Sequence, residues 1–127
     1  MTDKKPRISV QSAKSKGRRG QQFIVKELQT LYPTLEPDDI KSCPMGSTGS
    51  DVQLSPAARK LIEYEFEVKS VAKATIWTNY EQAARHAAKS PSKSTPVVVT
   101  KVDRKPALAT IEWSHLVDLW RRAGVCP

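Results

Sequence analysis

The alternation of apolar and polar side chains predicts a β-strand over residues 61–69, which read LIEYEFEVK. With the two-residue period of a strand, one face is apolar and consists of Ile62, Tyr64, Phe66 and Val68. The opposite face carries three glutamates and then Lys69. Neighbours on one face lie only about 6.6 Å apart, so the three carboxylates repel one another. Such a face is either exposed to solvent or neutralised by a cation.

The same patterns divide the rest of the chain into helices and strands. We expect a first helix, three strands, a second helix, two strands and a third helix, with a helical turn starting at Pro56 before the third strand. The expected ranges are 21–31 for the first helix, 40–43, 51–54 and 61–69 for the strands, 78–90 for the second helix, 95–102 and 107–111 for the last strands, and 114–123 for the last helix. This order predicts a single α/β domain.

Three details of the helices refine this picture. Thr78 and Glu81 have the spacing of a capping box, which predicts the start of the second helix. Ser114 is expected to cap the last helix, which would turn its stripe of Leu116, Leu119, Trp120 and Ala123 inward. In the first helix, Glu27 falls inside the apolar stripe of Phe23, Ile24, Leu28 and Leu31. A carboxylate there either reaches a partner at a cleft or snorkels at the margin of the stripe.

Charge indicates the kind of partner. The chain of 127 residues has 21 Lys and Arg against 13 Asp and Glu, a formal net charge of +8, which favours a polyanion such as nucleic acid. Seven of the basic residues fall within residues 1–19, against the single acid Asp3. This stretch is expected to be a mobile arm, acting either as a solubilising tail or in binding, ahead of one domain over residues 20–127.

The cysteines and histidines form no recognisable motif. Cys43 and Cys126 belong to no CxxC or Cys/His cluster, and His86 and His115 have no metal-ligand spacing. No apolar run approaches the length of a membrane span, and the N-terminus lacks the apolar core of a signal peptide. We therefore expect a cytoplasmic protein with reduced thiols and no membrane partner.

Asp51, Glu67 and Lys69 form the most informative group of residues. Asp51 and Glu67 fall on strands that are expected to be adjacent as a hairpin-like pair, and Lys69 shares the face of Glu67. Two carboxylates and a strand carbonyl make a sparse oxygen site suited to Mg²⁺, which keeps several waters and leaves room for a phosphate. A neighbouring lysine can position the attacking water or offset charge in the transition state.

The element order and several segments together resemble the PD-(D/E)XK nuclease superfamily, and within it the small Holliday-junction-resolvase type and related phage-encoded nucleases. The resemblance covers about residues 17 to 120. The matching segments are RRGQ at 18–21, GSDV at 49–52, LSPAAR at 54–59, EVK at 67–69, and Trp77 with EQA at 81–83. It implies a restriction-endonuclease-like αβββαβ core, with a mixed central sheet flanked by helices.

The resemblance also implies roles for individual residues. Asp51 and Glu67 would be metal ligands, the carbonyl of Val68 would complete the ligand set, and Lys69 would be the catalytic lysine. Gln82 matches a glutamine frequently found near the site, and Glu27 matches the first-helix acid of the archaeal resolvases. The expected ion is Mg²⁺, with Mn²⁺ as a substitute, and no small-molecule cofactor is expected. One departure is Ser50, which stands where the signature has proline.

The function that this resemblance implies is hydrolysis of DNA phosphodiester bonds, with four-way Holliday junctions as the expected substrate and a homodimer as the expected assembly. Two alternatives remain open, a non-catalytic nucleic-acid-binding module and a nuclease for nicks, flaps or duplex DNA. The basic residues expected to contact DNA are Lys16, Arg18, Arg19, Lys73 and Arg85.

Overall fold

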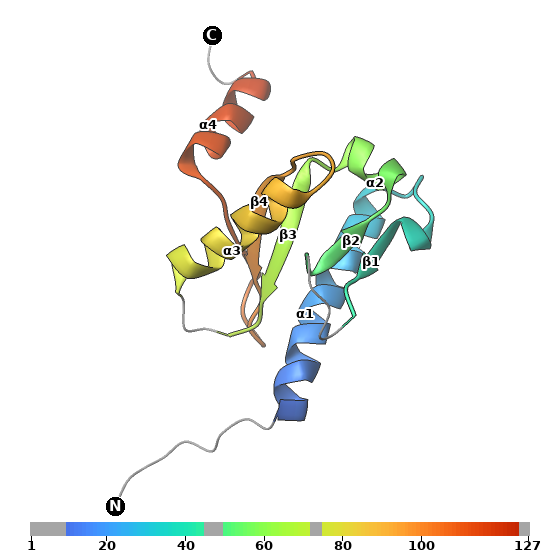
Figure 1. Ribbon diagram of the computed structural model, residues 1–127, viewed down its shortest axis with the longest axis vertical. Coiled ribbons are helices and arrows are strands. Elements are labelled where there is room, and N and C mark those ends of the chain that lie inside the picture. Colours follow the sequence, from blue (N-terminus) through green and yellow to red (C-terminus); the bar gives the residue numbers. More distant parts are fainter. Residues whose placement is uncertain (1–9, 45–49, 72–74, 125–127) are drawn as a thin grey trace, which may run out of the picture.

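The computed structural model describes residues 10–44, 50–71 and 75–124. Helices and strands alternate along the chain in the mixed α/β class that the sequence predicts (Figure 1). The elements are α1 (Val10–Leu31), the 3₁₀ helix η1 (Pro37–Asp39), β1 (Ile40–Ser42), β2 (Val52–Leu54), α2 (Pro56–Leu61), β3 (Tyr64–Lys69), α3 (Ile76–Lys89), β4 (Thr95–Thr100), β5 (Leu108–Thr110) and α4 (Trp113–Arg122).

The strands pair in two sheets. β1 and β2 form an antiparallel pair, while β3 pairs parallel with β4, which pairs antiparallel with β5. The parallel pair requires a crossover, and α3 supplies it. We expected one central sheet with β2 and β3 as a hairpin-like pair, and this was wrong for the residues described, because β2 and β3 share no ladder. The six-residue helix α2 separates the two strands, so no tight turn brings their backbones into register.

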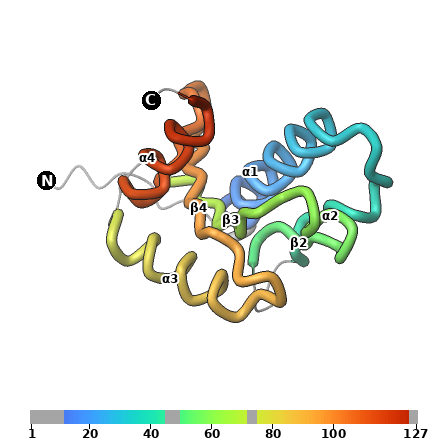
Figure 2. Tube along the Cα trace, turned by 90° about the horizontal axis from the view of Figure 1, so that it is seen from above, coloured from blue at the N-terminus to red at the C-terminus, as the bar shows by residue number. Residues whose placement is uncertain are grey.

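Two helices lie on opposite sides of β3 and β4, as Figure 2 shows. α1 packs against β1, β2 and β3, and so bridges the two sheets, while α3 packs against β3 and β4. Ala83 and Ala87 are buried on α3, where their small side chains allow close packing on the strands. This face of α3 therefore packs on the sheet.

The core lies between α1 and the strands. Ile24 and Leu28 of α1 are buried, as are Ile62 and Phe66 around β3, so the predicted apolar face of β3 does enter the core. The core cluster is Ile24, Leu28, Ile40, Val52, Leu54, Ala58, Ile62, Phe66, Val97 and Val99. Leu31 is 68% exposed and does not belong to it, since α1 ends there and the apolar stripe has passed beyond the sheets.

All three long helices begin earlier than expected. α1 starts at Val10 rather than at residue 21, so residues 10–19 are helical and not an irregular arm. The expectation for residues 1–9 lies outside the described part of the chain. α3 starts at Ile76, with Thr75 as its N-cap in place of Thr78, and α4 starts at Trp113 after the N-cap Glu112. In α3 and α4 the residues before the expected cap tolerate helical geometry, so each helix extends beyond the capping signal.

The last helix is only loosely covered. None of the described residues of α4 is buried, and Trp120, expected to point inward, is 45% exposed. α4 projects past one end of the sheet in Figure 1. Polar contacts connect it to the strand region, where Arg122 Nη1 lies 2.7 Å from Glu63 Oε1 and His115 Nε2 lies 2.9 Å from the Tyr64 hydroxyl.

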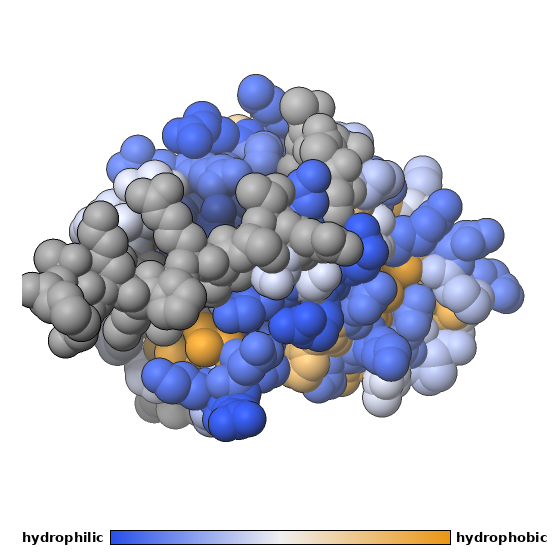
Figure 3. All heavy atoms as spheres, turned by 90° about the horizontal axis from the view of Figure 1, so that it is seen from below, coloured by the Kyte–Doolittle hydropathy of each residue, from blue (hydrophilic) through white to orange (hydrophobic). Residues whose placement is uncertain are grey.

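The face drawn in Figure 3 is mainly hydrophilic, with small separate hydrophobic areas. Within the described residues, no helix combines the length and the apolar character needed to cross a membrane.

Candidate active site

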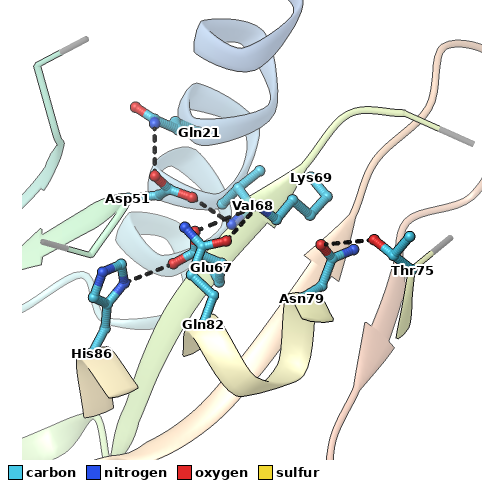
Figure 4. Close-up of polar contacts among 9 residues, drawn as sticks. All are labelled: Gln21, Asp51, Glu67, Val68, Lys69, Thr75, Asn79, Gln82 and His86. Atoms are coloured by element: carbon cyan, nitrogen blue, oxygen red, sulfur yellow. Dashed lines mark hydrogen bonds and ion pairs between the residues drawn. The ribbon is translucent and has the colours of Figure 1, made fainter. Parts of the chain in front are cut away.

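Asp51 connects the two sheets through its side chain. It lies directly before β2, and its Oδ2 accepts a hydrogen bond from the Val68 backbone N–H of β3 at 2.7 Å (Figure 4). Its Oδ1 accepts a second hydrogen bond from Gln21 Nε2 of α1 at 3.3 Å. Asp51 therefore has a fixed position next to β3, although the backbones of β2 and β3 are not paired.

The carbonyl of Val68 lies on the same side of β3 as Asp51. In the parallel ladder, Glu63 O accepts from Thr95 N at 2.7 Å and Lys69 O accepts from Lys101 N at 2.8 Å, so the odd-numbered residues of this strand bond to β4. Alternate residues of a strand direct their backbone groups to opposite sides. Val68 therefore has its carbonyl on the side away from β4, where its N–H already contacts Asp51.

Glu67 is a buried carboxylate between two basic side chains. Only 3% of it is exposed, and its Oε2 lies 3.0 Å from His86 Nδ1 of α3, while its Oε1 lies 3.8 Å from Lys69 Nζ. Burial raises the pKa of Glu67 above its ordinary value, and the negative charge of Asp51 raises it further. His86 and Lys69 act in the opposite direction without cancelling this effect. The two carboxylates thus repel each other across the gap between the sheets.

Lys69 and Gln82 complete the predicted group. Lys69 Nζ donates a hydrogen bond to Gln82 Oε1 at 2.9 Å, which fixes the ammonium group beside Glu67. The structure therefore brings together Asp51, Glu67, Val68, Lys69 and Gln82, drawn from the start of β2, from β3 and from α3 (Figure 4).

Glu27 is not part of this group. It is exposed, and the residue of α1 that contacts Asp51 is Gln21. Six residues of helix separate the two, which corresponds to about 240° around the axis and about 9 Å along it. The proposed role of Glu27 as a metal ligand is therefore not supported by its position.

The other glutamates of β3 also have basic partners. Glu65 is buried, and its Oε2 lies 3.1 Å from Arg59 Nη1 of α2, so at this residue the acidic face is neutralised and not exposed to solvent. Glu63 pairs with Arg122. The acidic face of the strand is thus in contact with basic side chains from three different helices.

Gln21 and His86 are the two members of the site that sequence reasoning missed. Gln21 lies three residues before Ile24 and seven before Leu28, so a polar side chain occupies a position of the apolar stripe of α1. His86 follows Gln82 by four residues, which places both on one face of α3. These helical spacings are the signals that could have identified them.

The residues expected to contact DNA are distributed around the site. Lys16 and Arg19 lie on the turns of α1 just before Gln21, and Arg19 Nη2 is 3.6 Å from Asp103 Oδ2. Arg18 and Arg85 are exposed, and Lys73 lies outside the described residues.

The donor chemistry of the site fits a hard divalent cation. Across residues 10–44, 50–71 and 75–124, no group of three or more His, Cys, Asp and Glu side chains is placed to hold a metal ion. Asp51, Glu67 and the Val68 carbonyl instead provide three oxygen donors with mutually repelling carboxylates. An oxygen set of this size suits Mg²⁺ or Mn²⁺ that retains water, whereas structural zinc takes four protein ligands, mainly nitrogen and sulfur.

Comparison with known proteins gave no match, whether with family models, curated proteins or solved structures. The resemblance to the PD-(D/E)XK nucleases therefore rests on the sequence segments alone.

Proposed function

We propose that this chain is a Mg²⁺-dependent endonuclease that hydrolyses DNA phosphodiester bonds, with the element order of a restriction-endonuclease-like αβββαβ core although its strands form two sheets. The observation that carries the proposal is the proximity of Asp51 and Glu67. Asp51 lies directly before β2, and its hydrogen bond of 2.7 Å to the Val68 N–H holds it beside the residue of β3 that follows Glu67. Burial and the charge of Asp51 both disfavour ionised Glu67, and a bound cation would relieve this cost, which is an arrangement typical of functional sites.

Each residue of the site has a role in this reaction. Asp51, Glu67 and the Val68 carbonyl would hold the ion, which when bound supplies charge stabilisation at phosphate and activation of water. Lys69 orients the attacking water or offsets charge on the phosphorane-like transition state. Gln82 fixes the Lys69 ammonium group at 2.9 Å, and Gln21 and His86 orient the two carboxylates.

The test is a cleavage assay with isosteric and truncating variants. Asp51→Asn and Lys69→Ala are each expected to reduce cleavage of DNA with Mg²⁺ or Mn²⁺ by about 10²-fold or more while binding survives, because they remove transition-state interactions and not the basic surface. Glu27→Gln serves as a control and should keep wild-type activity. A wild-type protein that cuts no DNA with either ion would overturn the proposal.

For the substrate we propose branched DNA, and for the assembly a homodimer, since resolution of a four-way junction requires two coordinated nicks. A panel of labelled four-way, three-way, flap, linear and single-stranded DNAs tests the substrate, with symmetrical paired nicks in the four-way DNA as the expected product. Preferential cutting of linear duplex would contradict the junction assignment, and a monomer by sedimentation in the presence of junction would contradict the dimer.

A non-catalytic nucleic-acid-binding module is the second candidate. The observations that favour it are the net charge of +8 and the basic partner that each glutamate of β3 already has. Under this alternative the wild type cuts no DNA, and Asp51→Asn leaves DNA binding unchanged, because the acids are then only structural. The cleavage assay separates the two candidates.

A further inference from the structure

Two basic cavities flank the candidate active site. We call the first the α3 pocket, a cavity of about 510 Å³ whose lining includes Ser50, Arg59, Glu65, His86 and Lys89. The second, the α1 pocket, has about 210 Å³, and its lining includes Lys16, Arg19, Ser70, Lys101 and Asp103.

Both cavities share residues or chain neighbours with the site. In the α3 pocket, Ser50 directly precedes Asp51, and His86 hydrogen bonds to Glu67 at 3.0 Å. In the α1 pocket, Ser70 directly follows Lys69, and Gly20, which also lines it, directly precedes Gln21. Each cavity is therefore lined in part by residues that adjoin the candidate metal ligands or Lys69.

The two cavities lie at different levels of β3 and on opposite sides of it. The α3 pocket includes Glu65 and the α1 pocket includes Ser70, which are separated by about 16 Å of extended chain, with Glu67 and Lys69 between them. α3 and α1 themselves cover opposite sides of β3 and β4 (Figure 2). A polymer that follows β3 from one cavity to the other passes Glu67 and Lys69.

The charges in both cavities favour anions. In the α1 pocket, three cations face the single acid Asp103. Lys101 Nζ is fixed there by the carbonyls of Val102 at 3.0 Å and Lys105 at 2.9 Å. In the α3 pocket, the buried Glu65 holds Arg59 in place and Lys89 adds a second cation.

We propose that the α3 and α1 pockets bind backbone phosphates on the two sides of the scissile phosphate, along one nucleic-acid strand. Cations and serine hydroxyls are the groups that contact phosphate oxygens in nucleic-acid complexes. This inference rests on the proposed function for the position of the scissile phosphate, but phosphate binding itself does not require cleavage.

The first experiment measures DNA binding in the Asp51→Asn background, so that no cleavage occurs. Lys89→Gln tests the α3 pocket and Lys16→Gln the α1 pocket, since glutamine removes the charge and retains helix propensity. Arg59 is left intact, because its loss would leave Glu65 buried and unpaired. Lys26→Gln is the matched control, an exposed lysine of α1 about 15 Å along the helix from Lys16.

Each pocket variant is expected to weaken binding by about three- to tenfold and to lower the slope of log affinity against log salt by about 1, while the control matches the parent. Pocket variants that behave like Lys26→Gln would overturn the proposal.

The second experiment locates the phosphates. A single neutral methylphosphonate is placed at successive positions around the cut that the wild-type protein makes. If Lys89 contacts one flanking phosphate, neutralising that phosphate weakens the parent but not Lys89→Gln, and Lys16→Gln shows the same insensitivity on the other side of the cut. If the losses of affinity from the methylphosphonate and from the lysine substitution add at every position, the proposal is contradicted.

The two proposals fail in different ways. If the wild type cuts no DNA but both pocket variants have reduced salt slopes, the nuclease proposal is refuted and the phosphate-pocket proposal is supported. Metal-dependent cleavage with unchanged slopes would keep the nuclease and remove the pockets.

Discussion

At the scale of single residues, the electrostatics of Glu67 dominate the site. Its carboxyl is buried beside the negative charge of Asp51, and both effects raise its pKa above the ordinary value of 4.5. A raised pKa in the folded state means that the protonated form stabilises the fold, fully at pH values below 4.5, and that this stabilisation is lost as pH rises through the folded-state pKa. Without metal, an increase of pH through the folded-state pKa of Glu67 therefore lowers the free energy of unfolding.

Glu67→Gln should consequently stabilise the metal-free protein. We expect its melting temperature in EDTA to exceed that of the wild type by about 3–5 °C at neutral pH, a shift that corresponds to roughly 1 kcal/mol in a domain of this size. The difference should disappear below pH 4.5, where the wild-type carboxyl is protonated. Glu81→Gln, at an exposed position of α3, is the control and should have no such effect. A lower melting temperature of Glu67→Gln at neutral pH would contradict this account.

At the scale of elements, the packing of α1 on β3 depends on Gly20. A Cβ atom on this residue would lie 2.9 Å from Val68 Cγ1, which is shorter than contact distance. Only glycine therefore permits the present approach of α1 to β3. This close approach also brings Gln21 within reach of Asp51.

Gly20→Ala is expected to lower the free energy of unfolding by about 1–3 kcal/mol through overpacking, although alanine has the higher helix propensity. Gly17→Ala, in the same helix, is expected to raise it by about 0.5–1 kcal/mol through that propensity. Chemical denaturation measures the free energy of unfolding of both variants, which should change in opposite directions. Equal stabilisation by both would show that α1 can move away from β3 without cost.

The contact of α4 with the start of β3 should depend on pH. The hydrogen bond with Arg122 is the main cause that lowers the pKa of Glu63 below its ordinary value of 4.5. A lowered pKa means that the contact stabilises the fold above pH 4.5 and that this contribution is lost as pH falls through the folded-state pKa. Both side chains are about half exposed, so the effect is small.

Arg122→Gln should therefore reduce the melting temperature slightly at neutral pH and not at all in strong acid. Trp113 and Trp120, whose rings lie 5.9 Å apart on α4, provide a fluorescence signal for the helix. Arg121→Gln at the neighbouring exposed position is the control. A deficit of Arg122→Gln that persists below the folded-state pKa of Glu63 would exclude the ion pair as its cause.

Regular patterns made the elements predictable, and contacts between distant residues limited the rest. The period of β3 correctly assigned Ile62 and Phe66 to the core. The helix starts were wrong because a capping signal such as Thr78 with Glu81 competes with residues before it that also accept helical geometry.

The same limit applied to the candidate site. Asp51, Glu67, Lys69 and Gln82 were predicted from a linear motif and do lie together. Which residue of α1 reaches them depends on the rotation of the helix against β3, and the sequence pattern does not determine this rotation. Glu27 was therefore chosen in place of Gln21. The contact of His86 with Glu67 likewise arises only when α3 folds back over the strand.

At the scale of the whole molecule, the candidate site connects two sheets that share no ladder within the described residues. Asp51 belongs to the β1–β2 side and Glu67 to the β3–β4–β5 side. A cation bound to both would stabilise the native arrangement of the two halves by mass action, because it binds the folded state only.

Mn²⁺ at about 100-fold excess over its dissociation constant is therefore expected to raise the melting temperature of the wild type by about 10 °C, the effect of about 2.7 kcal/mol. Asp51→Ala and Glu67→Ala should each lose this response. Asp38→Ala, an exposed acid of η1, should retain it. The same increase in Asp51→Ala as in the wild type would place the ion elsewhere.

The hydrogen bond from the Val68 amide to Asp51 also provides a natural reporter. This N–H faces away from β4, so a carboxylate and not a ladder carbonyl shields it from water. Its rate of hydrogen–deuterium exchange in an NMR spectrum therefore follows how often Asp51 leaves its position, whereas ladder amides of the same strand follow the opening of the sheet. A single resonance thus distinguishes disassembly of the site from unfolding of the domain, without any label or substrate.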